Sequence, residues 1–190
     1  MSIIAAIKNR NSNAFMSDRE VDPDLIRQIL DAAVCTPVHY RTDPWRFLVI
    51  RGAGRKKLGD VMAAHLAKGM SDPDSPKNIE LRDKMRKKSF RAPVIIVAGA
   101  ARTDCAKGLM VEDVASVSVS CQNILLAAEE LGLSAFWRTG SLTYAEDTVQ
   151  ALGFDKDTAL AGFIYLGYPA KEMPPKPRPT SEAFTRWMNE

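Results

Sequence analysis

An unbroken apolar run, residues 94–101, limits the fold of this chain more than any other sequence feature. Pro93 opens the run, and its valines and isoleucines predict a β-strand over residues 94–99. Because both faces of such a strand are apolar, the strand must be covered by other elements on both sides. The run has eight residues, far fewer than the ~20 that span a bilayer. We therefore predict the central strand of a layered fold and no transmembrane helix.

Further strands and helices follow from hydrophobic periodicity and from helix-start signals. Short runs of β-forming residues predict three more strands, over residues 45–50, 133–137 and 161–166. Thr143 and Glu146 have the spacing of a capping box, so we expect a helix that opens at Thr143. Other helices are predicted over residues 2–8, from Asp22-Pro23 onward, and over 55–67, 77–89 and 111–131. Helices on both sides of four apolar strands indicate an α+β or α/β layered fold.

The tail from Gly167 onward contains five prolines and cannot form a regular helix or a central strand. Its aromatic residues Phe184 and Trp187 would have little to bury on their own domain. We therefore expect the tail to wrap a partner subunit in a homodimer. Without an internal repeat or a linker, residues 1–190 are predicted to form a single domain, with residues 168–190 as an extended C-terminal arm on the partner subunit.

Composition and absent motifs exclude several classes of function. Hydrophobic residues (46%) and charged residues (26%) have the balance of a globular protein, and a net charge of +3 is too small to indicate a polyanionic partner. Three cysteines without a C-x-x-C spacing and two histidines predict neither a disulfide framework nor a metal site. P-loop, G-x-G-x-x-G, H-E-x-x-H and G-x-S-x-G motifs are missing. Apolar N-terminal residues precede Lys8 and Arg10, the wrong order for a secretory signal, so a cytoplasmic location is expected.

Four separated polar clusters are the candidates for a binding site. Residues 9–12 place the Arg10 guanidinium, a hydroxyl and free backbone amides together, a combination that suits a phosphate or another anion. The other clusters are the proline-bounded loop 36–47, the strand end 136–140, where a glycine permits close backbone approach, and the basic run 175–179. Each cluster alone also fits a solvated turn or loop without a ligand.

In this order and at these separations, the clusters resemble the FMN-dependent nitroreductase family, and most closely its minimal, short-chain subgroup. The resemblance extends over nearly the whole chain. It implies an α+β fold, a three-layer α/β/α sandwich with a mixed, mainly antiparallel sheet, in a domain-swapped homodimer that holds FMN at the subunit interface. The motifs that carry it are Arg10-Asn11-Ser12, Pro44-Trp45, Arg91-Ala92-Pro93, Trp137-Arg138-Thr139-Gly140, Leu166-Gly167-Tyr168-Pro169 and Lys176-Pro177-Arg178-Pro179.

The resemblance also implies which residues bind the cofactor and the substrates. One group would hold the ribityl phosphate and flank the flavin: Arg10, Asn11 and Ser12, with Arg178 and Lys176 neutralising the phosphate. A second group would come from the other subunit: Cys35, Pro37 and His39. Trp137, Arg138, Thr139 and Gly140 would line the pocket, mostly through backbone groups. Substrate contacts would come from Tyr40 and from the stretch between Ala127 and Gly132, which resembles a nicotinamide-binding segment. Cys35 departs from the subgroup, which usually has a basic residue at this position.

The implied activity is that of an FMN-dependent NAD(P)H oxidoreductase. Hydride would pass in a ping-pong cycle from NAD(P)H through FMN to a nitroaromatic, a quinone or a similar small-molecule acceptor. Because the flavin carries the hydride, no catalytic side chain is needed and none is predicted. Two alternatives remain: a protein of the same fold that sequesters FMN without rapid NAD(P)H turnover, and a nucleic-acid-binding module that uses the basic helix over residues 77–91. With the first interpretation, neither nucleic acid nor a membrane is an expected partner.

Overall fold

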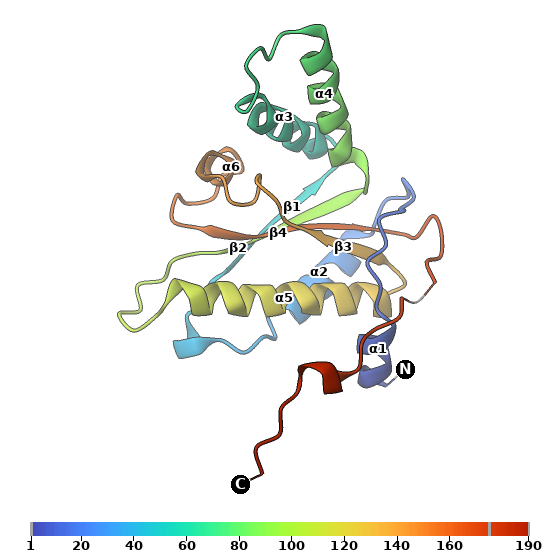
Figure 1. Ribbon diagram of the computed structural model, residues 1–190, viewed down its shortest axis with the longest axis vertical. Helices are drawn as coiled ribbons and strands as arrows, with labels where there is room; N and C mark the ends of the chain where they lie inside the picture. Colours follow the sequence, from blue (N-terminus) through green and yellow to red (C-terminus); the bar gives the residue numbers. More distant parts are fainter. Residues whose placement is uncertain (1, 175, 190) are drawn as a thin grey trace.

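A computed structural model describes residues 2–174 and 176–189; Met1, Pro175 and Glu190 belong to the predicted domain but lie outside the described residues. Strand β2 (Val94–Ala100) is buried along its whole length, as its apolar run predicts. It pairs with β1 (Trp45–Arg51) on one side and with β4 (Ala159–Gly167) on the other. Strand β3 (Ser134–Arg138) pairs with β4 and completes the order β1-β2-β4-β3 (Figure 1).

All three strand pairings are antiparallel. Of the two fold classes that the sequence left open, the structure therefore has the α+β fold and not the α/β fold, whose sheets are parallel. The mixed sheet that the resemblance implied differs from this observation. A parallel strand could be added only at the free edge of β1 or β3, and the described part of the chain supplies none.

Helices cover both faces of the sheet, so the three-layer α/β/α architecture is confirmed (Figure 1). On one face lie α2 (Pro23–Ala33) and α5 (Met110–Glu130). On the other lie α3 (Gly54–Ala67) and α6 (Glu146–Ala151), with α4 (Pro76–Lys87) packed on α3. Each face of the sheet has its own hydrophobic core, one against α2 and α5 and the other against α3 and α6. Because side chains alternate along a strand, successive residues of β2 pack alternately in these two cores.

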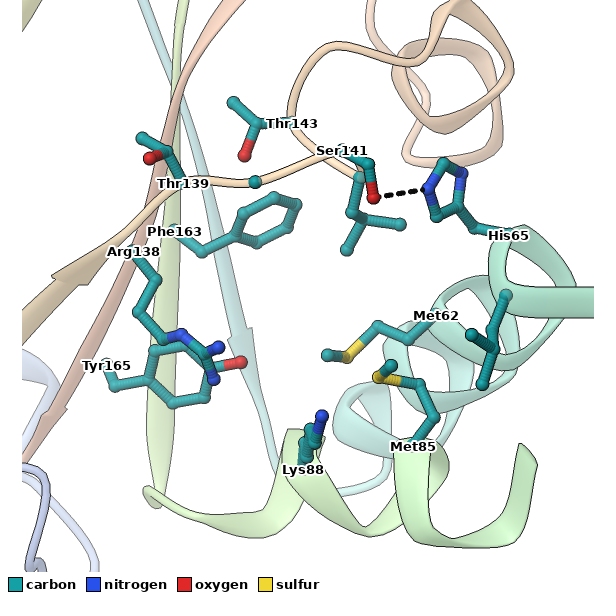
Figure 2. A pocket seen from close by; sticks show the side chains of 13 residues that line it. Met62, His65, Met85, Lys88, Arg138, Thr139, Ser141, Thr143, Phe163 and Tyr165 are labelled. Carbon is teal, nitrogen blue, oxygen red and sulfur yellow. Dashed lines mark hydrogen bonds between the residues drawn. The ribbon is translucent and has the colours of Figure 1, made fainter. Parts of the chain in front are cut away.

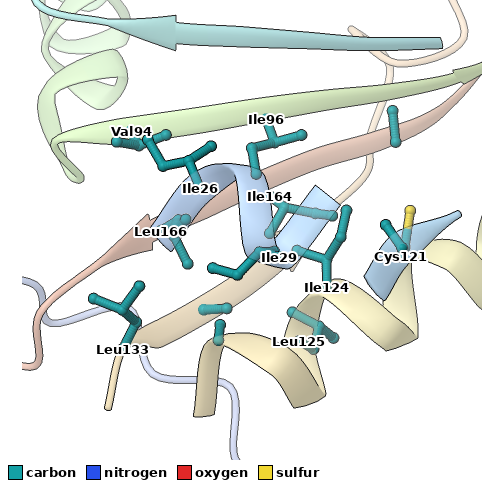
Figure 3. Close-up of a cluster of buried hydrophobic side chains, with 14 of the residues drawn as sticks. Ile26, Ile29, Val94, Ile96, Cys121, Ile124, Leu125, Leu133, Ile164 and Leu166 are labelled. Atoms are coloured by element: carbon teal, nitrogen blue, oxygen red, sulfur yellow. The ribbon is translucent and has the colours of Figure 1, made fainter. Parts of the chain in front are cut away.

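The core beneath α5 shows how the helical stripes meet the sheet (Figure 3). Ile124 of α5 and Ile29 of α2 are fully buried against Ile164 of β4. The start of α2 is the predicted one, since the Asp22 side chain accepts a hydrogen bond from the Asp24 amide and Pro23 occupies the first turn. Both helices therefore bury the apolar faces that their periodicity predicts.

The predicted capping box at Thr143 and Glu146 is wrong. Helix α6 begins at Glu146 with Ala145 as its N-cap, and no side chain caps it. The Thr143 amide instead donates to the Gly140 carbonyl at 2.9 Å, inside a tight turn. That turn buries Thr143 and leaves Ala145 as the last extended residue before the helix.

The N-terminal helix α1 (Ile3–Asn9) and the C-terminal arm lie beside each other, near one end of α5 (Figure 1). After the bridge between Met16 and Pro169 the arm is extended, apart from the short 3-10 helix η3 (Ser181–Phe184). The arm leaves the body of the molecule, and the side chain of Trp187 is 80% exposed. Two further 3-10 helices occur, η1 (His39–Arg41) and η2 (Lys88–Phe90). Across the described residues, no helix has both the length and the apolar character to span a membrane.

Candidate functional site

The first and fourth polar clusters meet at the end of α1. Arg10 ends this helix, and its carbonyl oxygen accepts a hydrogen bond from Arg178 Nη2 at 3.0 Å. Arg10 Nη1 donates to Ser12 Oγ at 3.5 Å, and Asn11 Nδ2 donates to the Pro174 carbonyl at 3.3 Å. The arm thus brings an arginine from each end of the chain to one place. Lys176 is exposed on the same arm, two residues before Arg178.

The charges at this place favour an anion. Burial, and next the positive charge of Arg178, lower the pKa of Arg10, while Glu129 acts in the opposite direction. Burial raises the pKa of Glu129, and the Arg10 charge partly offsets this rise. Because an arginine stays protonated in proteins, the two guanidinium groups repel each other unless an anion lies between them. A phosphate with its three acceptor oxygens would satisfy both.

A cavity of about 400 Å³ opens beside this pair, between the end of α1, the end of α5 and the start of β3. Arg10, Asn11 and Gly132 line it, so the structure joins the first cluster to the end of the predicted nicotinamide segment. Ala127 does not line the cavity and packs instead against the core beneath α5. Glu129 places a carboxylate in the same cavity, which disfavours a second phosphate there.

The third cluster lies on β3, the edge strand of the sheet. Trp137 directs its indole into the sheet interior, where Nε1 donates to the Ala161 carbonyl at 3.1 Å. Arg138 points to the opposite face, with its guanidinium 5.9 Å from the centre of the Phe136 ring. The Trp137 side chain is therefore structural, and the part of this residue left for a ligand is its backbone. That the cluster binds a cofactor through its backbone stays a prediction.

A second cavity, of about 170 Å³, lies between the sheet and α3, and Arg138, Thr139 and Gly140 line it (Figure 2). Its other walls come from α3, α4, η2 and β4, and include Lys88 and Tyr165. Sequence analysis did not single out Tyr165, because a tyrosine in an apolar strand has no distinguishing pattern. Lys88 was one of several lysines in the basic helix, and its position toward the sheet depends on how that helix packs.

The second cluster lies elsewhere in the chain. Thr42 Oγ1 donates at 2.8 Å to Asp113, a carboxylate only 4% exposed at the start of α5. His39 Nδ1 is 3.6 Å from Glu112 of the same helix, and Tyr40 adopts a positive φ of 53°. The Cys35 thiol is exposed and donates to the Asp31 carbonyl, and Pro37 is exposed.

Within one chain this loop lies far from Arg10. Glu112, beside His39, and Glu129, beside Arg10, are separated by about 25 Å along the axis of α5. Figure 1 shows α1 near one end of α5 and the light-blue loop around residue 40 near the other. The structure therefore brings the first and fourth clusters together beside the start of β3, the strand that carries the third cluster, and leaves the second near the far end of α5.

Metal coordination is not indicated by the arrangement of side chains. Throughout residues 2–174 and 176–189, no three His, Cys, Asp or Glu side chains are grouped as metal ligands.

The three-layer α/β/α sandwich with its antiparallel sheet places the protein in the class of nitroreductase-like α+β folds. The model of the Nitroreductase family matches residues 7–168, and this chain belongs to that family of oxidoreductases, as its motifs predict. Curated relatives include "Putative NADH dehydrogenase/NAD(P)H nitroreductase" of Methanothermobacter thermautotrophicus, 35% identical over 176 residues, which cover 90% of this chain and 79% of that protein. "Putative NAD(P)H nitroreductase YdjA" of Escherichia coli K12 is 29% identical over 170 residues, 89% of each protein.

Solved structures confirm the fold. The "Nitroreductase-like Family Protein" of Bacillus cereus superposes with a TM-score of 0.84 at 27% identity, over 100% of this chain and 97% of that one. A "putative nitroreductase in complex with fmn" from Desulfovibrio desulfuricans gives a TM-score of 0.76 at 27% identity, over 100% and 99% of the two chains.

Proposed function

We propose that this protein is an FMN-dependent NAD(P)H oxidoreductase that works as a homodimer. The observation that carries the proposal is the meeting of Arg10, Ser12 and Arg178 beside the free edge of β3. The FMN-bound relative from Desulfovibrio desulfuricans, alike over the whole chain, supports FMN as the ligand.

The residues present fit the phosphate of FMN. Two guanidinium groups, one hydroxyl and the Asn11 amide offer charged and neutral donors to a dianion, and the mutual repulsion of the arginines is relieved when it binds. Arg178 reaches this place on the arm, so the arm and the end of α1 hold the phosphate together.

The edge of β3 fits the polar edge of the flavin ring. The Asn13 amide reaches the Ala135 carbonyl at 3.4 Å from the outer side of the strand, so the backbone of Ala135 faces outward. Because direction alternates along an antiparallel strand, the N–H and C=O of Trp137 face outward as well. These groups would orient the flavin, whose own chemistry, when bound, is to accept and to deliver a hydride.

The dimer completes the site in this proposal. If two copies pack α5 against α5 in antiparallel directions, the His39 loop of one copy meets the Arg10 end of the other. Exposed apolar side chains support such an interface: Ile3 on α1 is 73% exposed, and Val119 on α5 and Trp187 on the arm are also uncovered. Cys35, Pro37 and His39 would then serve the partner's flavin, and Tyr40 its substrate.

The reaction would be a two-electron reduction of the acceptor. For a nitroaromatic, ArNO₂, NAD(P)H and H⁺ give ArNO, NAD(P)⁺ and water. For a quinone, NAD(P)H and H⁺ give the dihydroxy product and NAD(P)⁺. The two substrates would use the same site in turn, which is the ping-pong order.

Ion pairing on α4 weighs against the nucleic-acid alternative. Lys84 pairs with Glu80, Arg86 with Asp60 and Asp83, and Arg82 with Asp74. Partners of this kind reduce the free positive charge that phosphates would need. The FMN-sequestering alternative has the same fold and the same proposed phosphate site, so only a measurement of NAD(P)H turnover distinguishes it from an oxidoreductase.

The visible spectrum of the purified protein tests the proposal. We expect bound flavin whose bands bleach within seconds when NADH or NADPH is added without oxygen. Arg10→Ala should lose the flavin, whereas Lys8→Ala, two residues earlier on α1, should keep it. A colourless protein that gains no thermal stability from FMN contradicts the proposal, and bound flavin that NAD(P)H leaves oxidised favours sequestration.

A further inference from the structure

The 170 Å³ cavity between the sheet and α3 has an apolar body that suits one aromatic ring (Figure 2). The thioethers of Met62 and Met85 face the Phe163 ring across it. Methionine sulfur packs favourably on aromatic rings and adapts to their shape. Cavities of about 150 Å³ bind benzene, so this one has room for a single ring and little more.

Two uncompensated positive charges border the same space. Lys88 and Arg138 both line the cavity, and no carboxylate among the described residues lies within 4.0 Å of either. Two basic residues of α4 shortly before Lys88, Lys84 and Arg86, do have acidic partners. The cations nearest the cavity are therefore the ones left for a ligand.

Neutral polar groups complete the lining. The Tyr165 hydroxyl points into the cavity in Figure 2. Burial raises the pKa of Tyr165, although Arg138 and Arg91 act against this, so its hydroxyl keeps its proton and donates. His65 Nε2 shares a hydrogen bond of 3.0 Å with Ser141, whereas His65 Nδ1 and Thr143 Oγ1 are buried without a partner in the described chain. Buried polar atoms of this kind usually have a partner, and a bound molecule would supply one.

Thr139 and Gly140 line this cavity, and the family resemblance assigns the same two residues to the flavin pocket, so the cavity would adjoin the proposed flavin site. We propose that it selects the electron acceptor, and that the preferred acceptor is a monocyclic aromatic compound with a carboxylate. The ring would lie among Met62, Met85 and Phe163, with the carboxylate on Lys88 and Arg138. This inference rests on the proposed function for its redox part, but not for its binding part. With 4-nitrobenzoate, the balanced reaction consumes NAD(P)H and H⁺ and yields 4-nitrosobenzoate, NAD(P)⁺ and water.

The binding part is tested with benzoate and benzamide, which have nearly the same shape and differ in charge. We expect titration calorimetry on the protein as purified to give benzoate a Kd lower by about tenfold or more, as a charge-assisted contact supplies. Lys88→Met should reduce this preference about tenfold, because Arg138 remains, and Lys87→Met, an exposed neighbour outside the cavity, should keep it. Equal affinities for the two compounds, or a preference that Lys88→Met leaves unchanged, would overturn the inference.

Two further measurements fix the place and the size of the site. Benzoate should bind while the protein retains its flavin absorbance; release of FMN by benzoate would show a shared flavin subsite and overturn the inference. 2-Naphthoate should bind more weakly than benzoate, since the second ring exceeds the cavity, and tighter binding would contradict the size argument.

The redox part is tested by measuring how the preference between two acceptors changes from the unchanged protein to each variant. The preference in kcat/KM for 4-nitrobenzoate over 4-nitrobenzamide should fall about tenfold in Lys88→Met and stay unchanged in Lys87→Met. A colourless protein that still prefers benzoate would refute the proposed function and leave the pocket assignment standing. A flavin enzyme whose kcat/KM preference is unchanged in Lys88→Met would refute the pocket assignment and leave the proposed function standing.

Discussion

Mixed dimers give the sharpest test of how the site is assembled. Arg10→Ala should disable the phosphate end of each site, and His39→Ala should disable the contact that the proposal assigns to the partner subunit. When one subunit carries the first change and its partner the second, both changes fall in the same site. The other site then has an unchanged Arg10 and an unchanged His39.

The magnitudes follow from the two geometries. Loss of a charge-assisted contact costs about 1.5–3 kcal/mol, so Arg10→Ala should weaken FMN binding about 10- to 100-fold. His39 lies beside Glu112 and Arg10 beside Glu129, and these two positions are about 25 Å apart along α5, so one bound molecule does not reach both clusters of one chain. In the mixed dimer, one of two sites is intact, and the flavin content should return to about half that of the unchanged protein.

The assay uses two affinity tags on coexpressed subunits, so that tandem purification isolates the mixed dimer. Flavin is then counted from its absorbance per subunit after dialysis against buffer without FMN. Arg10→Ala paired with Arg178→Ala is the matched control, because Arg178 contacts Arg10 of its own chain. In that pair each site keeps one defect, and no flavin should return.

Two results would refute the reasoning. If the Arg10→Ala and His39→Ala pair holds no more flavin than either variant alone, His39 does not complete a partner's site. If the control pair regains flavin, Arg178 of the arm contributes to the site of the other subunit. The Arg10–Arg178 contact within one chain is then not the arrangement that binds FMN.

Three further outcomes are expected. Thr42→Val removes the hydrogen bond to buried Asp113, so it should destabilise the protein by about 1.5–3 kcal/mol in urea unfolding and weaken FMN binding through the loosened loop. Gly162→Ala should lower stability by about 3 kcal/mol or more, since its φ is +143° and a Cβ would lie 2.5 Å from Trp137 Nε1. Burial raises the pKa of Cys121 from 9.0 to about 12, so the folded state holds a proton that the unfolded state releases; stability should fall as pH rises through that range, and Cys121 should escape alkylation at pH 8 until the protein is denatured.

The sequence predicts the layers well because buried helix and strand faces produce a periodic pattern of apolar residues. The apolar run of β2 and the stripe on α5 each specify their surroundings, and their bounds agree with the structure to within a residue or two. Thr143 shows where local patterns fail. Its spacing to Glu146 fits a capping box, but the Thr143 amide donates to the Gly140 carbonyl in a turn, and α6 begins only at Glu146. The four residues from Thr143 to Glu146 do not show which of the two arrangements is more stable.

The candidate site depends on contacts that no local pattern encodes. Arg10 and Arg178 meet only because the arm turns back past α1, and the sequence connects them through family resemblance alone. Trp137 and Arg138 are neighbours in the chain yet lie on opposite faces of β3, the first packed in the core and the second lining the 170 Å³ cavity. A strand supplies such alternation, but which face is the functional one depends on the helices packed against each.

The length of α5 links cofactor binding to assembly. This helix separates the Arg10 cluster from the His39 loop by about 25 Å along its axis. If the His39 loop contacts the partner's flavin as proposed, a lone chain offers FMN only part of the contacts that a dimer would offer. A ligand that binds the dimer more tightly than the monomer must also strengthen the dimer, by the same factor. Dilution should therefore release flavin and subunits together, and added FMN should shift the monomer–dimer midpoint in sedimentation to lower protein concentration. Flavin retained at full stoichiometry by an isolated monomer would break this link and place the whole site within one chain.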